Sequence, residues 1–311
     1  MSLQSYQQIS IKTIMKNTIA IIVSRSGSTR VPGKALIDLC GESLLAHMIR
    51  IAKQIIKIDS IWLATTNLSE DDELERIALM HKINVFRGDP VNVLNRIYDT
   101  SKKAKADTIV YIGGDCPLLD PIIVSEAVDY FNKNEFDYLN NYDPPTYPGG
   151  MDINIINFNS LEIANRFAIA PSQRIHAFSY LTFHPEKFKI KKYSLNEDYS
   201  TFHWAIDYYE DIELIKLIYE KLLKKDEIIK MNDVFEVIRN NGKINKIHSK
   251  LKKQKVEHAF FSSLGMMSDI TFDIKFLADK ALDNLKDSNL HGAEVLYSEI
   301  ARISHKLSHL K

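Results

Sequence analysis

Cysteine is scarce in this sequence, charge of either sign is balanced, and long apolar runs are missing. Cys40 and Cys116 are the two cysteines among 311 residues, which excludes a disulfide framework and a four-thiolate zinc site. Reduced, isolated thiols are typical of the cytosol, so we expect a cytoplasmic protein. Lys+Arg and Asp+Glu both number 40, and no overall field therefore favours nucleic acid or an anionic membrane. Any anion site must be built locally.

Apolar segments are short throughout the chain. None approaches the roughly 20 residues needed to cross a bilayer. The polar stretch 1–16 lacks the apolar core of a secretory signal, and we interpret it as an N-terminal extension. With 45% hydrophobic and 26% charged residues, the composition is that of a globular protein able to bury a large core.

Strands and helices alternate along the first half of the sequence. Thr18–Val23, Ser60–Thr65 and Thr108–Ile112 are apolar runs typical of strands buried on both faces. Helical patterns of about 10–15 residues separate such runs, which predicts a three-layer, Rossmann-like α/β fold with a mainly parallel sheet. Ligands bind beyond the C-terminal ends of strands in such sheets. The loops after these three strands should therefore share one rim.

The remaining pattern divides the chain into a main domain and a tail. We expect the main domain at 17–248, a lysine-rich linker at 249–255 and a helical tail at 256–311. Two amphipathic helices in the tail, at 271–286 and 292–307, should pack on the main domain or on a second subunit. Other predicted helices cover 43–56, 71–81, 91–104, 160–167, 173–183, 209–223 and 233–240, and other strands 84–86 and 202–206.

The loop Ser24–Lys34 directly follows the first strand and is rich in groups that bind anions. Gly27 and Gly33 permit close backbone approach, so that successive N–H groups can point into one concavity. Its polar side chains are Ser24, Arg25, Ser26, Ser28, Thr29, Arg30 and Lys34. A solvated loop with incidental charges is the alternative, but three cations here suit a triphosphate. Ala35 after Lys34 excludes a Walker A motif.

Two aspartates end strands on the same rim. Asp115 follows Gly113-Gly114, and Asp207 ends the predicted strand at 202–206. Mg²⁺ usually takes one or two carboxylates together with phosphate oxygens, so the pair predicts a magnesium site. The structural alternatives are a turn residue for Asp115 and a helix N-cap for Asp207. Structural roles are expected for Asp120, Glu210 and Asp211.

Thr65 and Thr66 end the second strand and could contact a nucleotide base through backbone and hydroxyl groups. Gly149-Gly150 suits either a lid over the site or a plain turn. Cys116 is expected to be a packed thiol rather than a nucleophile.

Several motifs together resemble those of the CMP-sugar synthetase superfamily. They are STRVPGKAL, LLAHMIR, RGDPVNVLNRIYD, GGDCPLLDP and HWAIDYYEDIELIK, and they extend over Ile19–Lys246. The pattern is most similar to the spore-coat polysaccharide biosynthesis (SpsF-like) family, and more distantly to 3-deoxy-manno-octulosonate and acylneuraminate cytidylyltransferases. Two departures are Ser24-Arg25, where the family often has Ala-Arg, and Ile175, which replaces the acidic residue of an Arg-Glu-His motif.

The resemblance implies a nucleotidyltransferase fold of the nucleotide-diphospho-sugar transferase type. It implies Mg²⁺-dependent transfer of CMP from CTP to a small acidic acceptor, such as a sialic-acid-like, octulosonate-like or other surface-polysaccharide precursor, with release of pyrophosphate. A homodimer is also implied. Asp115 and Asp207 would hold the metal, Arg30 and Lys34 would stabilise pyrophosphate, Gly114 and Arg87 would lie near the nucleotide, and Arg174 and His176 would bind the acceptor.

Two other functions stay open. A nucleotide-sugar-dependent glycosyltransferase of polysaccharide synthesis has a similar fold, but usually carries Asp-x-Asp where this chain has Asp115-Cys116-Pro117. A non-catalytic assembly module would not need the full set of cations and carboxylates.

Overall fold

The computed structural model describes residues 16–142, 144–223 and 227–308, with side chains except at 252–270 and 306–308. Nearly all of the expected N-terminal extension, residues 1–15, lies outside the described residues. None of the described helices is long and apolar enough to cross a membrane.

A seven-stranded sheet forms the centre of the molecule, in the order β5-β4-β1-β6-β8-β7-β9. In that order the strands are Asn84–Gly88, Ser60–Thr66, Thr18–Val23, Thr108–Gly113, Asn154–Asn157, Tyr138–Asn140 and Ile190–Lys192. β8 is antiparallel to both its neighbours and the other pairs are parallel. Val23, the last residue of β1, pairs with Ala64 and Gly113. The three expected loops therefore leave one rim, as predicted.

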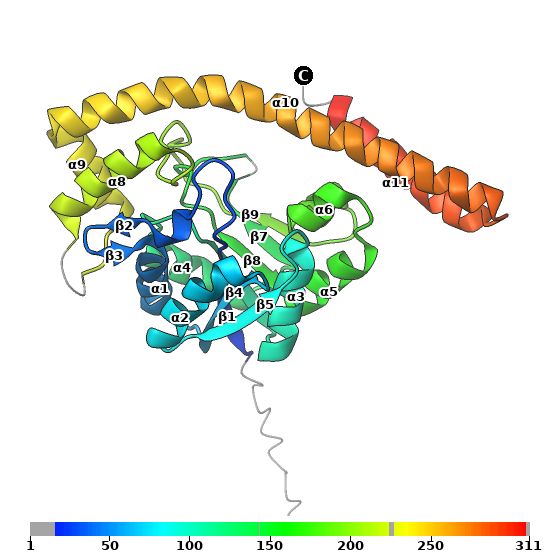
Figure 1. The fold of residues 1–311 in the computed structure, drawn as a ribbon, viewed down its shortest axis with the longest axis horizontal. Coiled ribbons are helices and arrows are strands. Elements are labelled where there is room, and N and C mark those ends of the chain that lie inside the picture. The colour runs from blue at the N-terminus through cyan, green and yellow to red at the C-terminus, as the bar shows by residue number, and fades with distance from the viewer. Residues whose placement is uncertain (1–15, 143, 224–226, 309–311) are drawn as a thin grey trace, which may run out of the picture.

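Helices cover both faces of this sheet (Figure 1). Ala20 and Ile22 face one core and Ile19 and Ile21 the other, the alternation that a strand buried on both sides requires. The first core contains α1 (Leu44–Gln54), α2 (Asp72–Met80), α4 (Pro121–Asn132), α8 (Tyr209–Leu222) and α9 (Met231–Asn240); the second contains α3 (Val93–Ala104), α5 (Phe158–Phe167) and α7 (Ser179–Phe183). The three-layer α/β prediction is confirmed.

Short elements complete the main domain. They are η1 (Lys34–Leu36), the β2–β3 hairpin (Asp38–Leu39 and Glu42–Ser43), η2 (Ser69–Asp71) and α6 (Pro171–Ile175).

One predicted strand is wrong, the predicted helix 173–183 is two short helices, α6 and α7, and some elements were not predicted. The segment 202–206 is not a strand, because its pairing is limited to an isolated bridge with the turn at Gly149, through Gly149 N to Phe202 O at 3.0 Å and Trp204 N to Gly149 O at 2.7 Å. Helix α4 was not anticipated, since its apolar, β-branched start resembles a strand; Asp120 caps it by accepting from Ile122 N at 2.9 Å. Strand β9 was also missed.

The tail is a long helical hairpin. α10 (Gly242–Lys286) runs without a break through 249–255, where a linker was expected, because lysine and glutamine are good helix formers and no glycine or proline interrupts them. α11 (Leu290–Ser308) returns along it, so the two predicted tail helices and their turn are confirmed. α10 contacts α8 and α9 near its start and α6 near its end (Figure 1).

The hairpin packs on α6 and α7 through apolar and polar contacts. Its apolar cluster comprises Ala170, Leu277, Ala281, Leu296 and Ile303. Within it, the buried carboxylate of Glu299 accepts from Gln173 Nε2 at 2.7 Å and lies 3.2 Å from His184 Nε2. Asp273 accepts from Ser172 N at 3.1 Å. The tail therefore belongs structurally to the main domain.

Replacing Glu299 by Ala should lower the free energy of unfolding by about 2–4 kcal/mol, because it leaves the buried Gln173 amide N–H and the Nε2 atom of His184 without their partner. Chemical denaturation measures the effect, and hydrogen exchange should locate it in α11. Glu294→Ala, an exposed change on the same helix, is the matched control. Equal stability of the two variants would contradict a buried polar contact.

Candidate functional site

The loop after β1 folds around the carbonyl oxygen of Ser26. This oxygen accepts from Ser28 N at 2.7 Å and from Gly33 N at 3.1 Å. Gly33 has a φ of 66°, in the left-handed region that glycine adopts without strain. The loop therefore closes into a compact turn before η1 begins at Lys34. The hydroxyl of Ser26 is buried and has no hydrogen-bond partner within the described part of the chain.

Asp71 anchors this loop to the end of β4. Its Oδ1 accepts from Ser26 N at 2.7 Å, and its Oδ2 accepts from Thr65 Oγ1 at 2.9 Å, Thr66 Oγ1 at 2.5 Å and Thr66 N at 3.0 Å. Burial by itself raises the pKa of Asp71, but these hydrogen bonds outweigh it and the pKa is lowered. The hydroxyls of Thr65 and Thr66 thus donate to Asp71, and contact of these two residues with a nucleotide base stays a prediction.

Asp115 lies at the end of β6 with Lys34 beside it. Lys34 Nζ donates to Asp115 Oδ2 at 2.7 Å and to Ile206 O at 2.8 Å, and Ile206 N donates to Asp115 O at 2.9 Å. A Cβ on Gly114 would lie 2.7 Å from Ser24 Cβ and 2.8 Å from Val23 O, so only glycine lets this turn pack under the loop. These contacts bring the loop, the end of β6 and the segment before Asp207 together.

Asp207 is paired with the second loop cation. Its Oδ1 lies 3.2 Å from Arg30 Nη2, and its Oδ2 lies 2.9 Å from His203 Nε2. The Arg30 guanidinium also lies over the Tyr208 ring, 5.2 Å from its centroid. Asp207 is not the N-cap of α8, because Tyr208 occupies that position. Asp211 instead stabilises this helix start by accepting from the N–H groups of Asp207 and Tyr208 at 2.8 and 2.9 Å.

The donor set fits a hard divalent cation. Ligand atoms of His203, Asp207 and Asp211 lie within 4.8 Å of one another, but an oxygen of Asp211 is engaged by backbone N–H groups. Asp115 and Asp207 remain as oxygen donors next to a loop that carries the cations Lys34 and Arg30. Magnesium typically binds in this way, through one or two carboxylates plus phosphate oxygens.

A third carboxylate, Asp152, lies in the same region and was missed from the sequence. Its pKa is raised to about 6, chiefly because surrounding protein atoms desolvate the carboxyl group although the residue keeps an exposed surface, and also by Asp115 and Asp207, with His203 acting in the opposite direction. The signal in the sequence is weak: a single acid between Gly149-Gly150-Met151 and an apolar strand. Cys116 is buried, and burial raises the pKa of its thiol, as expected for a packed residue.

Arg87 and Arg25 serve local structure. Arg87 Nη1 donates to Asp72 at 2.6 Å and Glu75 at 2.8 Å, and its other nitrogens donate to carbonyls of Thr66 and Leu68. The guanidinium is thereby engaged with α2 and the segment before it, and the anion contact expected for Arg87 stays a prediction. Arg25 donates to Pro90 O at 2.8 Å, at the foot of the loop.

Arg174 lies on α6 and His176 caps its C-terminal end, so neither residue belongs to the loop after β1. Arg174 Nη1 donates to Asn165 Oδ1 on α5 at 2.8 Å, and the ring of His176 is exposed. α6 lies towards the same end of the sheet as the loop, against α3 (Figure 1). Binding of an acceptor by these residues stays a prediction.

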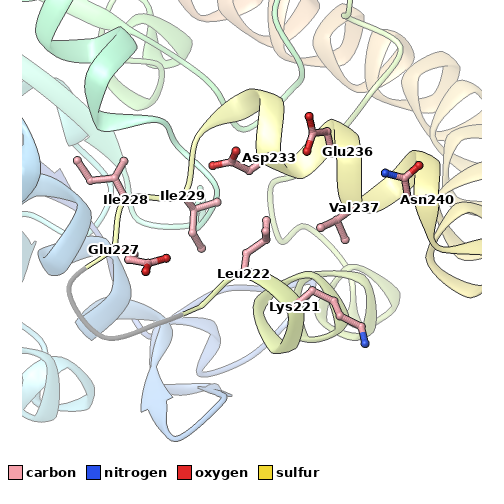
Figure 2. A pocket seen from close by; sticks show the side chains of 9 residues that line it. All are labelled: Lys221, Leu222, Glu227, Ile228, Ile229, Asp233, Glu236, Val237 and Asn240. Carbon is pink, nitrogen blue, oxygen red and sulfur yellow. The ribbon is translucent and has the colours of Figure 1, made fainter.

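A hollow of about 390 Å³ lies elsewhere, between the end of α8 and helix α9 (Figure 2). Its lining residues are Lys221, Leu222, Glu227, Ile228, Ile229, Asp233, Glu236, Val237 and Asn240. It contains none of the predicted site residues, and Asp233 is engaged in accepting from Lys230 N at the start of α9. The candidate site is therefore the group of loop cations and carboxylates at the rim of the sheet.

Comparison with known proteins identifies the family of this chain. The model of the family described as cytidylyltransferase matches residues 19–244. An uncharacterised protein of Methanocaldococcus jannaschii is 30% identical over 76% of this chain and 96% of its own, and the spore coat polysaccharide biosynthesis protein SpsF of Bacillus subtilis is 29% identical over 69% and 91%.

Solved structures give the same result. A cytidylyltransferase from Leptospira borgpetersenii superposes with a TM-score of 0.70 at 32% identity, covering 74% of this chain and 96% of that one. A CMP:2-keto-3-deoxy-manno-octonic acid synthetase solved with CTP shares the fold, with a TM-score of 0.55 at 16% identity over 67% and 100%. The chain therefore belongs to the cytidylyltransferase family of nucleotidyltransferase enzymes.

Proposed function

We propose that the protein is a Mg²⁺-dependent cytidylyltransferase that transfers CMP from CTP to a small acidic acceptor and releases pyrophosphate. The observation that carries this proposal is the meeting of two loop cations with two carboxylates, Lys34 with Asp115 and Arg30 with Asp207. Transfer from a nucleoside triphosphate needs both sets: cations for the phosphates and carboxylates for the metal.

The loop residues would bind and orient the triphosphate. Arg30 and Lys34 would supply positive charge where pyrophosphate departs, and the unpartnered Ser26 hydroxyl adds a donor. Asp71 holds the loop in this shape before the substrate arrives, so little reorganisation is needed.

Asp115 and Asp207 would hold the metal, whose chemistry is to neutralise phosphate charge and polarise the α-phosphate. Lys34 and Arg30 are the present partners of these carboxylates and would turn to the phosphates when CTP binds. The reaction joins an acceptor oxygen to the α-phosphorus and breaks its bond to the bridging oxygen of pyrophosphate. No covalent intermediate is required.

Pyrophosphate release tests the proposal. We expect release from CTP, and not from UTP, ATP or GTP, when one member of a panel of sugar acids, sugar phosphates and phosphonates is present with Mg²⁺. Omission of the acceptor and omission of the metal are the controls. Transfer of a sugar from a nucleotide sugar without CTP would contradict the proposal and favour a glycosyltransferase.

The proposal includes a homodimer in the cytoplasm. Light scattering of the full chain measures whether it forms a dimer, and cell fractionation measures whether it is found in the cytoplasm.

A further inference from the structure

The buried amide of Asn141 fixes the backbone at Asp152, just before β8 at the rim of the sheet. Asn141 Nδ2 donates to Met151 O at 2.7 Å, and Asn141 Oδ1 accepts from Ile153 N at 2.8 Å, so the amide holds the backbone on both sides of Asp152. On the N-terminal side, Gly150 packs against the backbone of Trp204 and Ala205. The Asp152 side chain is exposed, but the chain that carries it is held on both sides.

The carboxyl group of Asp152 belongs to the same electrostatic environment as the proposed metal ligands. Asp115 and Asp207 raise its pKa, and the neighbouring ring of His203 lowers it. Each proposed ligand has a loop cation, Lys34 or Arg30. Within the described part of the chain, the Asp152 oxygens have neither a hydrogen bond nor an ion pair, and the residue is exposed.

The order of the strands places Asp152 opposite the phosphate loop. β6, which ends before Asp115, lies between β1 and β8. The loop leaves β1 on one side, and Asp152 precedes β8 on the other. In a displacement at phosphorus, the entering and leaving oxygens are roughly in line on opposite sides. If the β1 loop holds the departing pyrophosphate, the acceptor enters from the side of β8, where Asp152 lies.

A carboxylate at this place selects among acceptors by its chemistry. It offers only hydrogen-bond acceptors, so it binds a hydroxyl or amide N–H. A phosphate or phosphonate placed against it would be repelled, since both groups are negative. A sugar acid can present a hydroxyl to Asp152 while its own carboxylate lies elsewhere in the site.

We propose that Asp152 is an acceptor-binding residue, which takes a hydrogen bond from a hydroxyl of a polyhydroxylated sugar acid and disfavours simple phosphates and phosphonates. This inference rests on the proposed function and narrows its acceptor. The acceptor is assigned to the part of the rim next to β8, and pyrophosphate to the part next to the loop after β1.

Asp152→Asn tests the assignment with two measurements. The KM for the sugar acid that supports pyrophosphate release should rise about 10- to 100-fold, the usual effect of losing a hydrogen bond to a charged group. The KM for CTP, the Mg²⁺ concentration for half-maximal rate and the calorimetric Kd of CTP with Mg²⁺ should each change less than twofold. Asp152→Ser repeats the test with a smaller side chain, and Asp279→Asn, an exposed change on α10, is the control.

Two results would overturn the inference. An unchanged KM for the sugar acid in both Asp152 variants would show that the carboxylate does not meet the acceptor. A weakened Kd for CTP with Mg²⁺ would show that it acts on the nucleotide or metal. Failure of the proposed function looks different, because the unaltered protein would then release no pyrophosphate from CTP with any acceptor.

Discussion

Replacing Asp115 by Asn should lower kcat for pyrophosphate release by about 10²–10³, the usual cost of removing one electrostatic group from such a centre. Asn has nearly the same shape but no charge, so it can still accept from Lys34 Nζ, now 2.7 Å from Asp115 Oδ2. The fold should therefore persist, and the Mg²⁺ concentration needed for half-maximal rate should rise. Steady-state kinetics across a magnesium series measures both effects, with thermal unfolding as the check on folding.

Asp120, five residues after Asp115, provides a control in which stability should change but the magnesium dependence should not. It caps α4 and accepts from Met231 N at 2.9 Å, away from the cations of the loop. Asp120→Ala should cost about 1–2 kcal/mol of stability and leave the magnesium dependence unchanged. If Asp115→Asn kept the full rate, the metal assignment would be wrong. If both variants lost rate and stability together, the loss would reflect misfolding rather than chemistry.

Replacing Gly150 by Ala should be the most destabilising single-methyl change in the site. Gly150 has a φ of 88°, and a Cβ there would lie 2.5 Å from Ala205 N and 2.8 Å from Trp204 C. Left-handed strain and a clash with backbone, which cannot rotate away, add to about 2–5 kcal/mol. The displaced segment carries Asp207 on its C-terminal side, so activity should fall as well. Chemical denaturation and the pyrophosphate assay measure the two effects.

Substitutions at two other glycines separate backbone strain from steric clash as causes of lost stability. Gly33 has a φ of 66°, and no atom lies within 4 Å of the place that an added methyl group would take, so Gly33→Ala should show backbone strain alone, about 1–2 kcal/mol. Gly242 has neither a positive φ nor a close neighbour, so Gly242→Ala should be neutral or slightly stabilising. Equal effects of the Gly33 and Gly150 variants would show that the contact with residues 204–205 is not tight.

The rim of the sheet could be predicted because its causes are local in sequence. Thr18–Val23 and Thr108–Gly113 are apolar on both faces, so they had to be central strands, and parallel pairing then brings their following loops to one edge. Strand pattern alone therefore places Lys34 and Asp115 on the same rim, and the 2.7 Å contact between them bears it out.

The missed features depend on partners that are distant in the chain. The hydrogen bonds from the Thr65 and Thr66 hydroxyls to Asp71 were not predicted, because only the three-dimensional turn of η2 brings Asp71 to them. Asp152 has no motif of its own; its importance comes from neighbours contributed by other segments. The helix through 249–255 was missed because a lysine run is equally compatible with a solvated linker and a solvated helix.

Lys34 pairs with Asp115 and Arg30 pairs with Asp207, so each cation of the site is already neutralised by a carboxylate. On the proposed function, nucleotide binding there would exchange ions: phosphate would take the cations, the divalent ion would take the carboxylates, and the sum of charge in the site would change little. Added salt screens the contacts that are given up as well as those that are gained. The affinity for the magnesium complex of CTP should therefore fall less steeply with ionic strength than the number of loop cations alone suggests.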